Sequence, residues 1–141
     1  MTVKHFLLDT VRSFIGPKIP LFNNKMAAIE KYSGLMEYIS NNLTAGLTVK
    51  KLAACVDVSV PHLSADFRKN FGLTLKRFLE NQMLARAENR LMHSHRKVKE
   101  IAEELGYANE YTFSHFFKKF NGSAPSVFRK NYQKLYSPAI D

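Results

Sequence analysis

The chain has 141 residues, 45% of them hydrophobic, so it can form a hydrophobic core but is short for two large independent domains. Its 21 Lys and Arg against 12 Asp and Glu give a formal net charge of +9, which favours a polyanionic partner such as nucleic acid or an acidic membrane surface. The sequence shows neither an apolar run of the roughly 18 residues that span a membrane nor a signal-peptide core, so we expect a cytoplasmic protein.

Helical periodicity dominates the first third of the chain. Residues 4–15, "KHFLLDTVRSFI", predict a short amphipathic helix, and the following "GPKIP" predicts a linker. From Lys25 to Leu43, apolar residues recur every three or four positions, which predicts one helix with a buried face. This part of the sequence contains no strand signal.

Two short helices, joined by a tight turn, follow in the middle of the chain. Thr48 is a candidate N-cap for "VKKLAACV", and Ser59 is one for "VPHLSADFRKNF", where Pro61 is tolerated in the first turn. Cys55, the single cysteine, lies in the apolar run "LAACV" and is expected to be buried with a structural role. The pair has the layout of a helix-turn-helix motif.

A longer apolar pattern from Leu75 to Leu91 predicts a helix of about 18 residues that spans roughly 27 Å. After it, "VKEIAEELG", "EYTFSHFFKKF" behind Asn109, and "PSVFRKNY" predict three more helices. The fold class is therefore all-α. We expect an N-terminal helix and linker over 1–23, a first helix-turn-helix subdomain over 24–73, a linker helix over 74–93, a second subdomain over 94–136 and a tail over 137–141.

The second helix pair repeats the first. Leu52 and Ala53 match Ile101 and Ala102 at an offset of 49, and "LSADFRKNFG" at 63–72 matches "FSHFFKKFNG" at 113–122 at an offset of 50. In the second copy, Gly106 ends the first helix and tolerates a positive φ. In the first copy, Asp57 takes the equivalent place.

The stretch "IAEELGYANEYTFSHFFKKFNGSAPSVFRK", residues 101–130, resembles the AraC family of bacterial transcription regulators, and the resemblance extends over residues 47–130. It implies two helix-turn-helix subdomains on a linker helix, sequence-specific promoter binding, and RNA polymerase as a further candidate partner. Residues 4–15 resemble the last helix of the sensing domain that often precedes this unit, so the chain is either a piece of a longer regulator or a small stand-alone one. The unit is expected to bind as a monomer, while a longer form could dimerise.

The candidate DNA contacts are the outward positions on the second helix of each helix-turn-helix pair, once positions expected to be buried, such as Leu63 and Phe113, are excluded. The base-reading candidates are Pro61, Ser64, Ala65 and Arg68 in the first copy and Tyr111, Thr112, Ser114, His115 and Lys118 in the second. The phosphate candidates are Thr48, Lys50, Lys69, Lys119, Arg129 and Lys130. The family commonly has arginine where Ala65 and His115 stand. Alanine can at most contact a thymine methyl group, whereas histidine can donate to or accept from base edges, so we expect the second helix to read more sequence than the first.

Other kinds of site find less support. His93 and His95 have no cysteine or acidic partner at ligand spacing, so neither a metal nor another cofactor is expected. Glu103 and Glu104 are adjacent on a predicted helix and point in different directions, so they form a poor acid/base pair. An enzyme is not expected. The remaining alternative is a basic protein that binds RNA, nucleic acid of any sequence, or a membrane surface.

Overall fold

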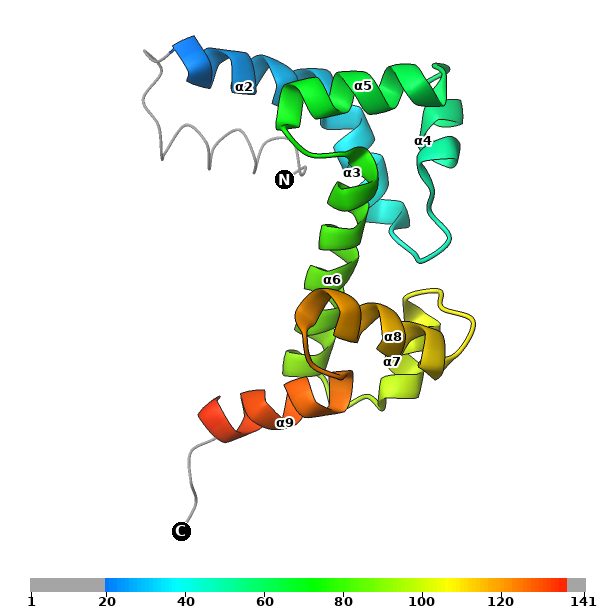
Figure 1. The fold of residues 1–141 in the computed structure, drawn as a ribbon, viewed down its shortest axis with the longest axis vertical. Coiled ribbons are helices and arrows are strands. Elements are labelled where there is room, and N and C mark those ends of the chain that lie inside the picture. Colours follow the sequence, from blue (N-terminus) through cyan, green and yellow to red (C-terminus); the bar gives the residue numbers. More distant parts are fainter. Residues whose placement is uncertain (1–19, 137–141) are drawn as a thin grey trace. The chain divides into compact units, whose positions relative to one another are not determined.

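The computed structural model describes residues 20–136, which form helices and no strands, and the all-α prediction is confirmed (Figure 1). The helices are α2 (Pro20–Lys31), α3 (Ser33–Asn42), α4 (Val49–Cys55), α5 (Val60–Phe71), α6 (Leu75–His93), α7 (Val98–Glu104), α8 (Glu110–Asn121) and α9 (Pro125–Tyr136). The amphipathic helix predicted over residues 4–15 lies outside the described residues.

Where one helix over 25–43 was predicted, the structure has two. α2 already begins at Pro20, inside the predicted linker, and a turn at Tyr32, with φ −97° and ψ 6°, separates it from α3. The next residues are Ser33 and Gly34, both of low helix propensity, which explains why the break occurs there. Tyr32 is 6% exposed, and its hydroxyl donates to the Asp66 carboxylate of α5. The break therefore places an aromatic ring against the first helix pair.

The first compact unit comprises, among the described residues, 20–43 and 47–78. Both predicted N-caps are confirmed: Thr48 Oγ accepts from the Lys51 backbone N–H at 3.2 Å, and Ser59 Oγ accepts from the His62 N–H at 3.2 Å. Asp57 has a φ of 54°, as expected for the residue that replaces glycine in this turn. These contacts fix the direction in which α5 leaves the turn.

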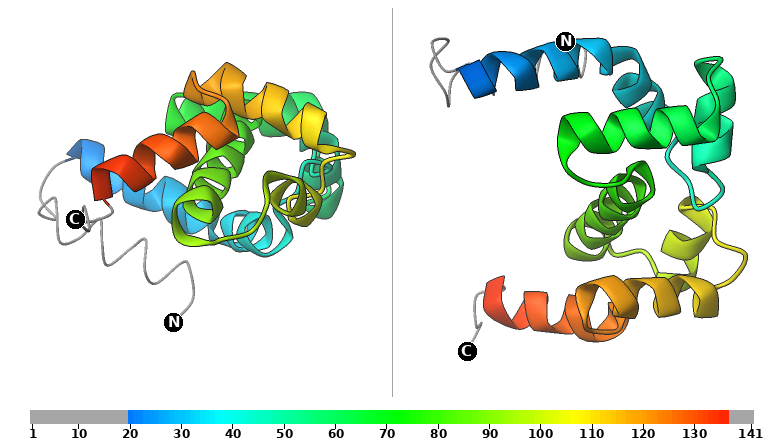
Figure 2. Two further views of the ribbon diagram at one scale, coloured as in Figure 1. Left: turned by 90° about the horizontal axis from the view of Figure 1, so that it is seen from below. Right: turned by 45° about the horizontal axis from the view of Figure 1, so that its top comes forward.

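The second compact unit comprises residues 44–46 and, among the described residues, 79–136. Asn109 caps α8 by accepting from the Thr112 N–H at 2.8 Å, and Gly106 has a φ of 86°. The short segment 44–46 covers the α7–α8 turn, since the Ala45 N–H donates to the Leu105 carbonyl at 2.8 Å. The helix pairs α4–α5 and α7–α8 can be followed from two further directions in Figure 2.

The internal repeat is visible in the core of each unit. Leu63 and Phe67 of α5 are 3% and 0% exposed, and Phe113 and Phe117 at the equivalent positions of α8 are both fully buried. The linker helix is confirmed as α6, which contributes its first turn to the first unit and its remaining turns to the second. The same inward positions on α5 and α8 leave the same outward positions free in both units.

The expectation for Cys55 was wrong. Its side chain is exposed, although it sits in an apolar run. The helix is only seven residues long, and its buried face is taken by Leu52 and Ala53, so the positions that follow point outward.

Candidate nucleic-acid interface

The outer face of α8 gathers most of the base-reading candidates of the second copy. Their side chains line a hollow of about 620 Å³ formed by Tyr111, Ser114, His115, Lys118, Lys119 and Ala124. Tyr111 is 77% exposed, and its ring meets the His115 ring edge to face at 6.0 Å between centroids. Hydroxyl, imidazole and ammonium groups, which can donate to base edges or phosphates, therefore lie on one accessible surface.

Ala124 was not among the sequence candidates. It stands between the left-handed Gly122 and the first residue of α9, Pro125, and lies at the edge of the hollow. The turn signal "NGSAP" marked its place in the chain, but only the return of the chain toward α8 brings it beside the outer face.

The equivalent surface of α5 has the same pattern of exposed positions but fewer hydrogen-bonding side chains. Pro61, Ala65 and Arg68 are exposed and Ser64 is half-buried, which matches the pattern of Tyr111, His115, Lys118 and Ser114 on α8. Only Arg68 carries a charged donor at these positions. The imbalance expected from the sequence is therefore present in the accessible side chains.

Two threonines among the candidates are engaged in capping. The Thr112 hydroxyl donates to Asn109 Oδ1 at 2.9 Å, and the same oxygen accepts the Thr112 N–H. Thr48 uses its oxygen to cap α4. Both threonines are exposed, so each stands at a helix N-terminus, where its hydroxyl helps to fix the first turn.

Four of the basic phosphate candidates are exposed and form no ion pair with another residue of the described range 20–136: Lys50, Lys69, Lys119 and Lys130. The Lys119 ammonium lies 5.3 Å from the centre of the Phe120 ring, which holds its stem against the surface of α8. The placement of these lysines on the surface is compatible with the phosphate role expected of them.

Arg129 is placed differently from the sequence expectation. It is half-buried, and its guanidinium donates to the carbonyl oxygens of Leu91 at 3.0 Å, Arg96 at 2.6 Å and Ser94 at 3.3 Å. These carbonyls belong to the end of α6 and the loop after it, so Arg129 fastens α9 to that loop. Because its guanidinium already donates to three backbone carbonyls, we propose a structural role for Arg129 in place of the phosphate contact expected from the sequence.

Two further ionic clusters were not anticipated from the sequence. Glu104 accepts from Arg90 Nε and Arg96 Nη1, both at 2.8 Å, and the hydrogen bond from Arg90, followed by the charges of both arginines, lowers the pKa of Glu104. In the first unit Asp66 accepts from Lys31 Nζ at 2.7 Å and from the Tyr32 hydroxyl, and these bonds lower the pKa of its carboxyl. Both clusters join helices within one unit, and both lie away from the outer faces of α5 and α8.

The other site types can be checked over residues 20–136. No group of three or more potential metal-binding side chains lies together there, and none of the helices there is long and apolar enough to cross a membrane. His93 instead packs edge to face on Tyr132, with ring centroids 5.9 Å apart.

Known proteins share this arrangement. A family model described as "Helix-turn-helix domain" matches residues 52–131. The raffinose operon transcriptional regulatory protein RafR of Pediococcus pentosaceus is 29% identical over 109 residues, which cover 77% of this chain and 39% of RafR. The bifunctional transcriptional activator/DNA repair enzyme AdaA of Bacillus subtilis is 32% identical over 108 residues, which cover 77% of this chain and 51% of AdaA.

A solved structure has the same fold. The DNA-binding domain of the global transcriptional factor AdpA, crystallised with a target DNA, superposes with a TM-score of 0.68 at 22% identity, covering 76% of this chain and 96% of that domain. The chain thus corresponds in extent to a DNA-binding domain, while it spans about half or less of the two regulators above.

Proposed function

This chain belongs to the AraC family of transcription regulators, and we propose that it binds double-stranded DNA sequence-specifically by inserting α5 and α8 into successive major-groove segments of a promoter. The observation that carries the proposal is the paired outer faces. Two helices of the same length bury the same positions and leave the same positions accessible, and one of these faces is lined with hydrogen-bonding side chains.

The outer face of α8 is assigned the larger share of sequence reading. His115 and Lys118 project from it and can donate to guanine, while Tyr111 offers a ring and a hydroxyl at the same surface. On α5, Arg68 is the one charged base-reading candidate, and Ala65 can at most contact a thymine methyl group. Lys50, Lys69, Lys119 and Lys130 are assigned to phosphates, which set affinity and register but not sequence.

The two helices belong to one chain and carry different residues, so the site they bind is asymmetric and one molecule occupies it. We expect their contacts to be about one helical turn apart, roughly 34 Å. Because the repeat is internal, a strictly palindromic site bound by two molecules would contradict this arrangement.

The rest of the proposal concerns the whole protein. RafR and AdaA are named as regulators, and AdaA also as a DNA repair enzyme, so we assign to this chain a regulatory role by binding, without catalysis of its own. RNA polymerase is proposed as a further partner, and the bacterial cytoplasm as the place of action. Since the matched relatives are longer, dimerisation and effector sensing are assigned to sequence outside the two units.

The competing function is binding of any polyanion through the net charge of +9. It would not require hydrogen-bonding side chains to be gathered on one helix face. A competition assay separates these two functions. Duplex DNA binding is competed by RNA and by anionic vesicles of equal charge, and only a protein that reads sequence keeps one preferred duplex under competition.

Site selection from random duplexes tests the assignment of readers. His115→Ala is expected to relax the preference at one or two base pairs in one half of the site, costing about 1–3 kcal/mol there. Ala65→Arg should add a guanine preference in the other half.

Lys134→Ala is the control, because it removes an exposed basic side chain from α9 and leaves the outer face of α8 unchanged. If His115→Ala leaves the selected sequence unchanged, His115 does not read bases.

A further inference from the structure

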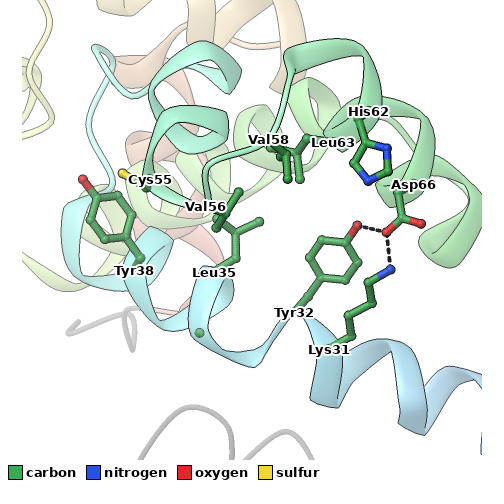
Figure 3. Close-up of a pocket in the computed structure, with 11 residues that line it drawn as sticks. Lys31, Tyr32, Leu35, Tyr38, Cys55, Val56, Val58, His62, Leu63 and Asp66 are labelled. Carbon is green, nitrogen blue, oxygen red and sulfur yellow. Dashed lines mark hydrogen bonds and ion pairs between the residues drawn. The ribbon is translucent and has the colours of Figure 1, made fainter.

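The first unit contains an apolar groove that the helix-turn-helix pairing does not fill. It has a volume of about 470 Å³ and lies between α3, the end of α4 and the first half of α5 (Figure 3). Tyr38 and Val56 remain 39% and 41% exposed at one end, where Cys55 is exposed as well. At the other end Asp66 accepts from Lys31 Nζ at 2.7 Å. The accessible apolar surface is thus the end formed by Tyr38, Cys55 and Val56, which we call the open end.

Larger apolar side chains stand at the equivalent positions of the second unit. Tyr107 takes the place of Val58 at the offset of 49, and its ring lies 5.3 Å from the Phe113 ring. Leu105, at the position of Val56, is 2% exposed. Because both units contain the same helix-turn-helix pair, this fold does not require an exposed side chain at Val56, and the open end is a candidate surface for a partner.

Acidic side chains surround this groove, although the chain as a whole is basic. The described residues of the first unit include four acidic ones, and each lines the groove or is next in the chain to a residue that lines it: Glu30, Glu37, Asp57 and Asp66. Asp66 is paired with Lys31. Glu37 and Asp57, next to the open end, are exposed and form no ion pair with another residue of 20–136. An apolar surface with uncompensated negative charge disfavours a DNA phosphate and favours a cationic partner.

The last turns of α9 have the complementary composition. Leu135 and Tyr136 are 76% and 70% exposed, and the Tyr136 ring lies 4.7 Å from the ring of Tyr132. Val127, eight residues before Leu135 and so on the same side of the helix, is 47% exposed. The charged residues of α9 are all basic, and the exposed Lys134 directly precedes Leu135. Apolar side chains are thus gathered beside a cation, on a helix face to which no base contact is assigned.

We propose that the open end of the groove binds the end of α9 from a second copy of this chain, with Leu135 against Val56. Lys134 of that copy then lies near the carboxylates of Glu37 and Asp57. An apolar side chain covers apolar surface in this contact, and a cation meets two unpaired anions. The contact is heterologous, because the groove and α9 are different surfaces, so each molecule offers its groove to one neighbour and its α9 to another.

The size of the two surfaces sets the strength of the contact. One helix end on one end of a groove falls in the class of interfaces below about 1,200 Å², which form transient complexes, so the contact is weak in free solution. It gains weight where two molecules lie side by side on one duplex, at an effective concentration on the order of 1 mM. A head-to-tail contact then favours asymmetric sites repeated in the same orientation. This consequence rests on the proposed DNA binding, whereas the contact itself does not.

Cys55 provides a built-in probe, because it lines the open end, is exposed, and is the only cysteine of the chain. The rate at which an aromatic disulfide reagent labels this thiol is measured in the full chain without DNA, from about 10 μM to about 1 mM protein. We expect wild-type labelling to slow about threefold over this range, the result for a Kd of about 0.2 mM. Leu135→Ser and Lys134→Glu should label at one rate throughout. Tyr111→Ser is the matched control, since Tyr111 is 77% exposed on α8, and it should slow like the wild type.

A mixing experiment identifies the surface that covers the thiol. Dilute Leu135→Ser protein should regain protection in an excess of Cys55→Ser protein, which supplies native α9, but not in an excess of the double variant Cys55→Ser, Leu135→Ser. A wild-type rate that does not depend on concentration overturns the proposal, and so does protection by the double variant, which would identify another surface of the second copy. Circular dichroism verifies that each variant keeps its helices. Leu135→Ser should bind a single duplex site like the wild type, so failure of this contact and failure of the proposed DNA binding are distinguishable.

Discussion

Replacement of Arg129 by alanine tests the reassignment of this residue from phosphate contact to internal fastening. The guanidinium donates to three backbone carbonyls, those of Leu91, Arg96 and Ser94, at 3.0, 2.6 and 3.3 Å. These acceptors lie at and beyond the C-terminus of α6, where the helix dipole adds to the attraction for a cation. Alanine would leave all three carbonyls without this donor.

The magnitude follows from the number and setting of these bonds. A hydrogen bond that involves a charged group contributes about 1.5–3 kcal/mol, and the two shorter bonds carry most of the effect. Because Arg129 is half-buried, water replaces part of what is lost, so we expect a loss of about 2–4 kcal/mol in the free energy of unfolding. That is a large share of the stability of a small domain, which is about 5–15 kcal/mol.

The assay is urea unfolding followed by circular dichroism, combined with the salt dependence of DNA binding. Arg129→Lys serves as the second variant, because it keeps the charge but lacks the planar fork that reaches three carbonyls. If Arg129 is internal, both variants unfold at lower urea, and in conditions where they remain folded the slope of log affinity against log salt stays at the wild-type value. Lys130→Ala, next to it and exposed, is the matched control and should do the reverse.

The opposite outcome would refute the reassignment. If Arg129→Ala unfolded at the wild-type urea concentration and made the salt slope shallower by about one, while Arg129→Lys bound like the wild type, the guanidinium would be a phosphate contact after all.

Three further predictions concern single residues. Gly106→Ala should destabilise the second unit by at least about 1 kcal/mol in thermal unfolding, because Gly106 has a φ of +86° and an added Cβ would lie 3.0 Å from Thr44 Cβ. A neutral effect would contradict the packing of segment 44–46 on this turn. Asp66→Asn should lower the unfolding midpoint at pH 7, and the difference from wild type should shrink as the pH falls below about 4. The reason is that the hydrogen bonds from Lys31 and Tyr32 lower the carboxyl pKa in the folded state and stabilise only the charged form. A difference that persists at low pH would assign the effect to packing. Lys119→Ala should make the salt slope of DNA binding shallower by about one and weaken all sequences alike, and an unchanged slope would place its ammonium away from the backbone.

Local patterns in the sequence were sufficient to predict the helices from residue 49 onward and their N-caps, but not the break between α2 and α3. Thr48, Ser59 and Asn109 each precede an apolar periodic stretch, and each accepts the backbone N–H three residues later as predicted. The repeat could also be predicted from the sequence, because two segments with the same spacing of apolar residues bury the same helix faces. Such features depend on interactions within a few residues of each other, which sequence order records directly.

The sequence by itself therefore determined the all-α class, the two helix-turn-helix pairs and which faces of α5 and α8 are accessible. Only the tertiary structure decided the hydrogen-bond partners of Arg129 and the exposure of Cys55 and Val56. Nothing beside Arg129 in the sequence marks the carbonyls it binds, since they come from residues 33–38 positions away. Val56 likewise is 41% exposed while Leu105 at the equivalent position is 2% exposed, because burial is decided by the neighbours that folding brings together and not by the residue itself.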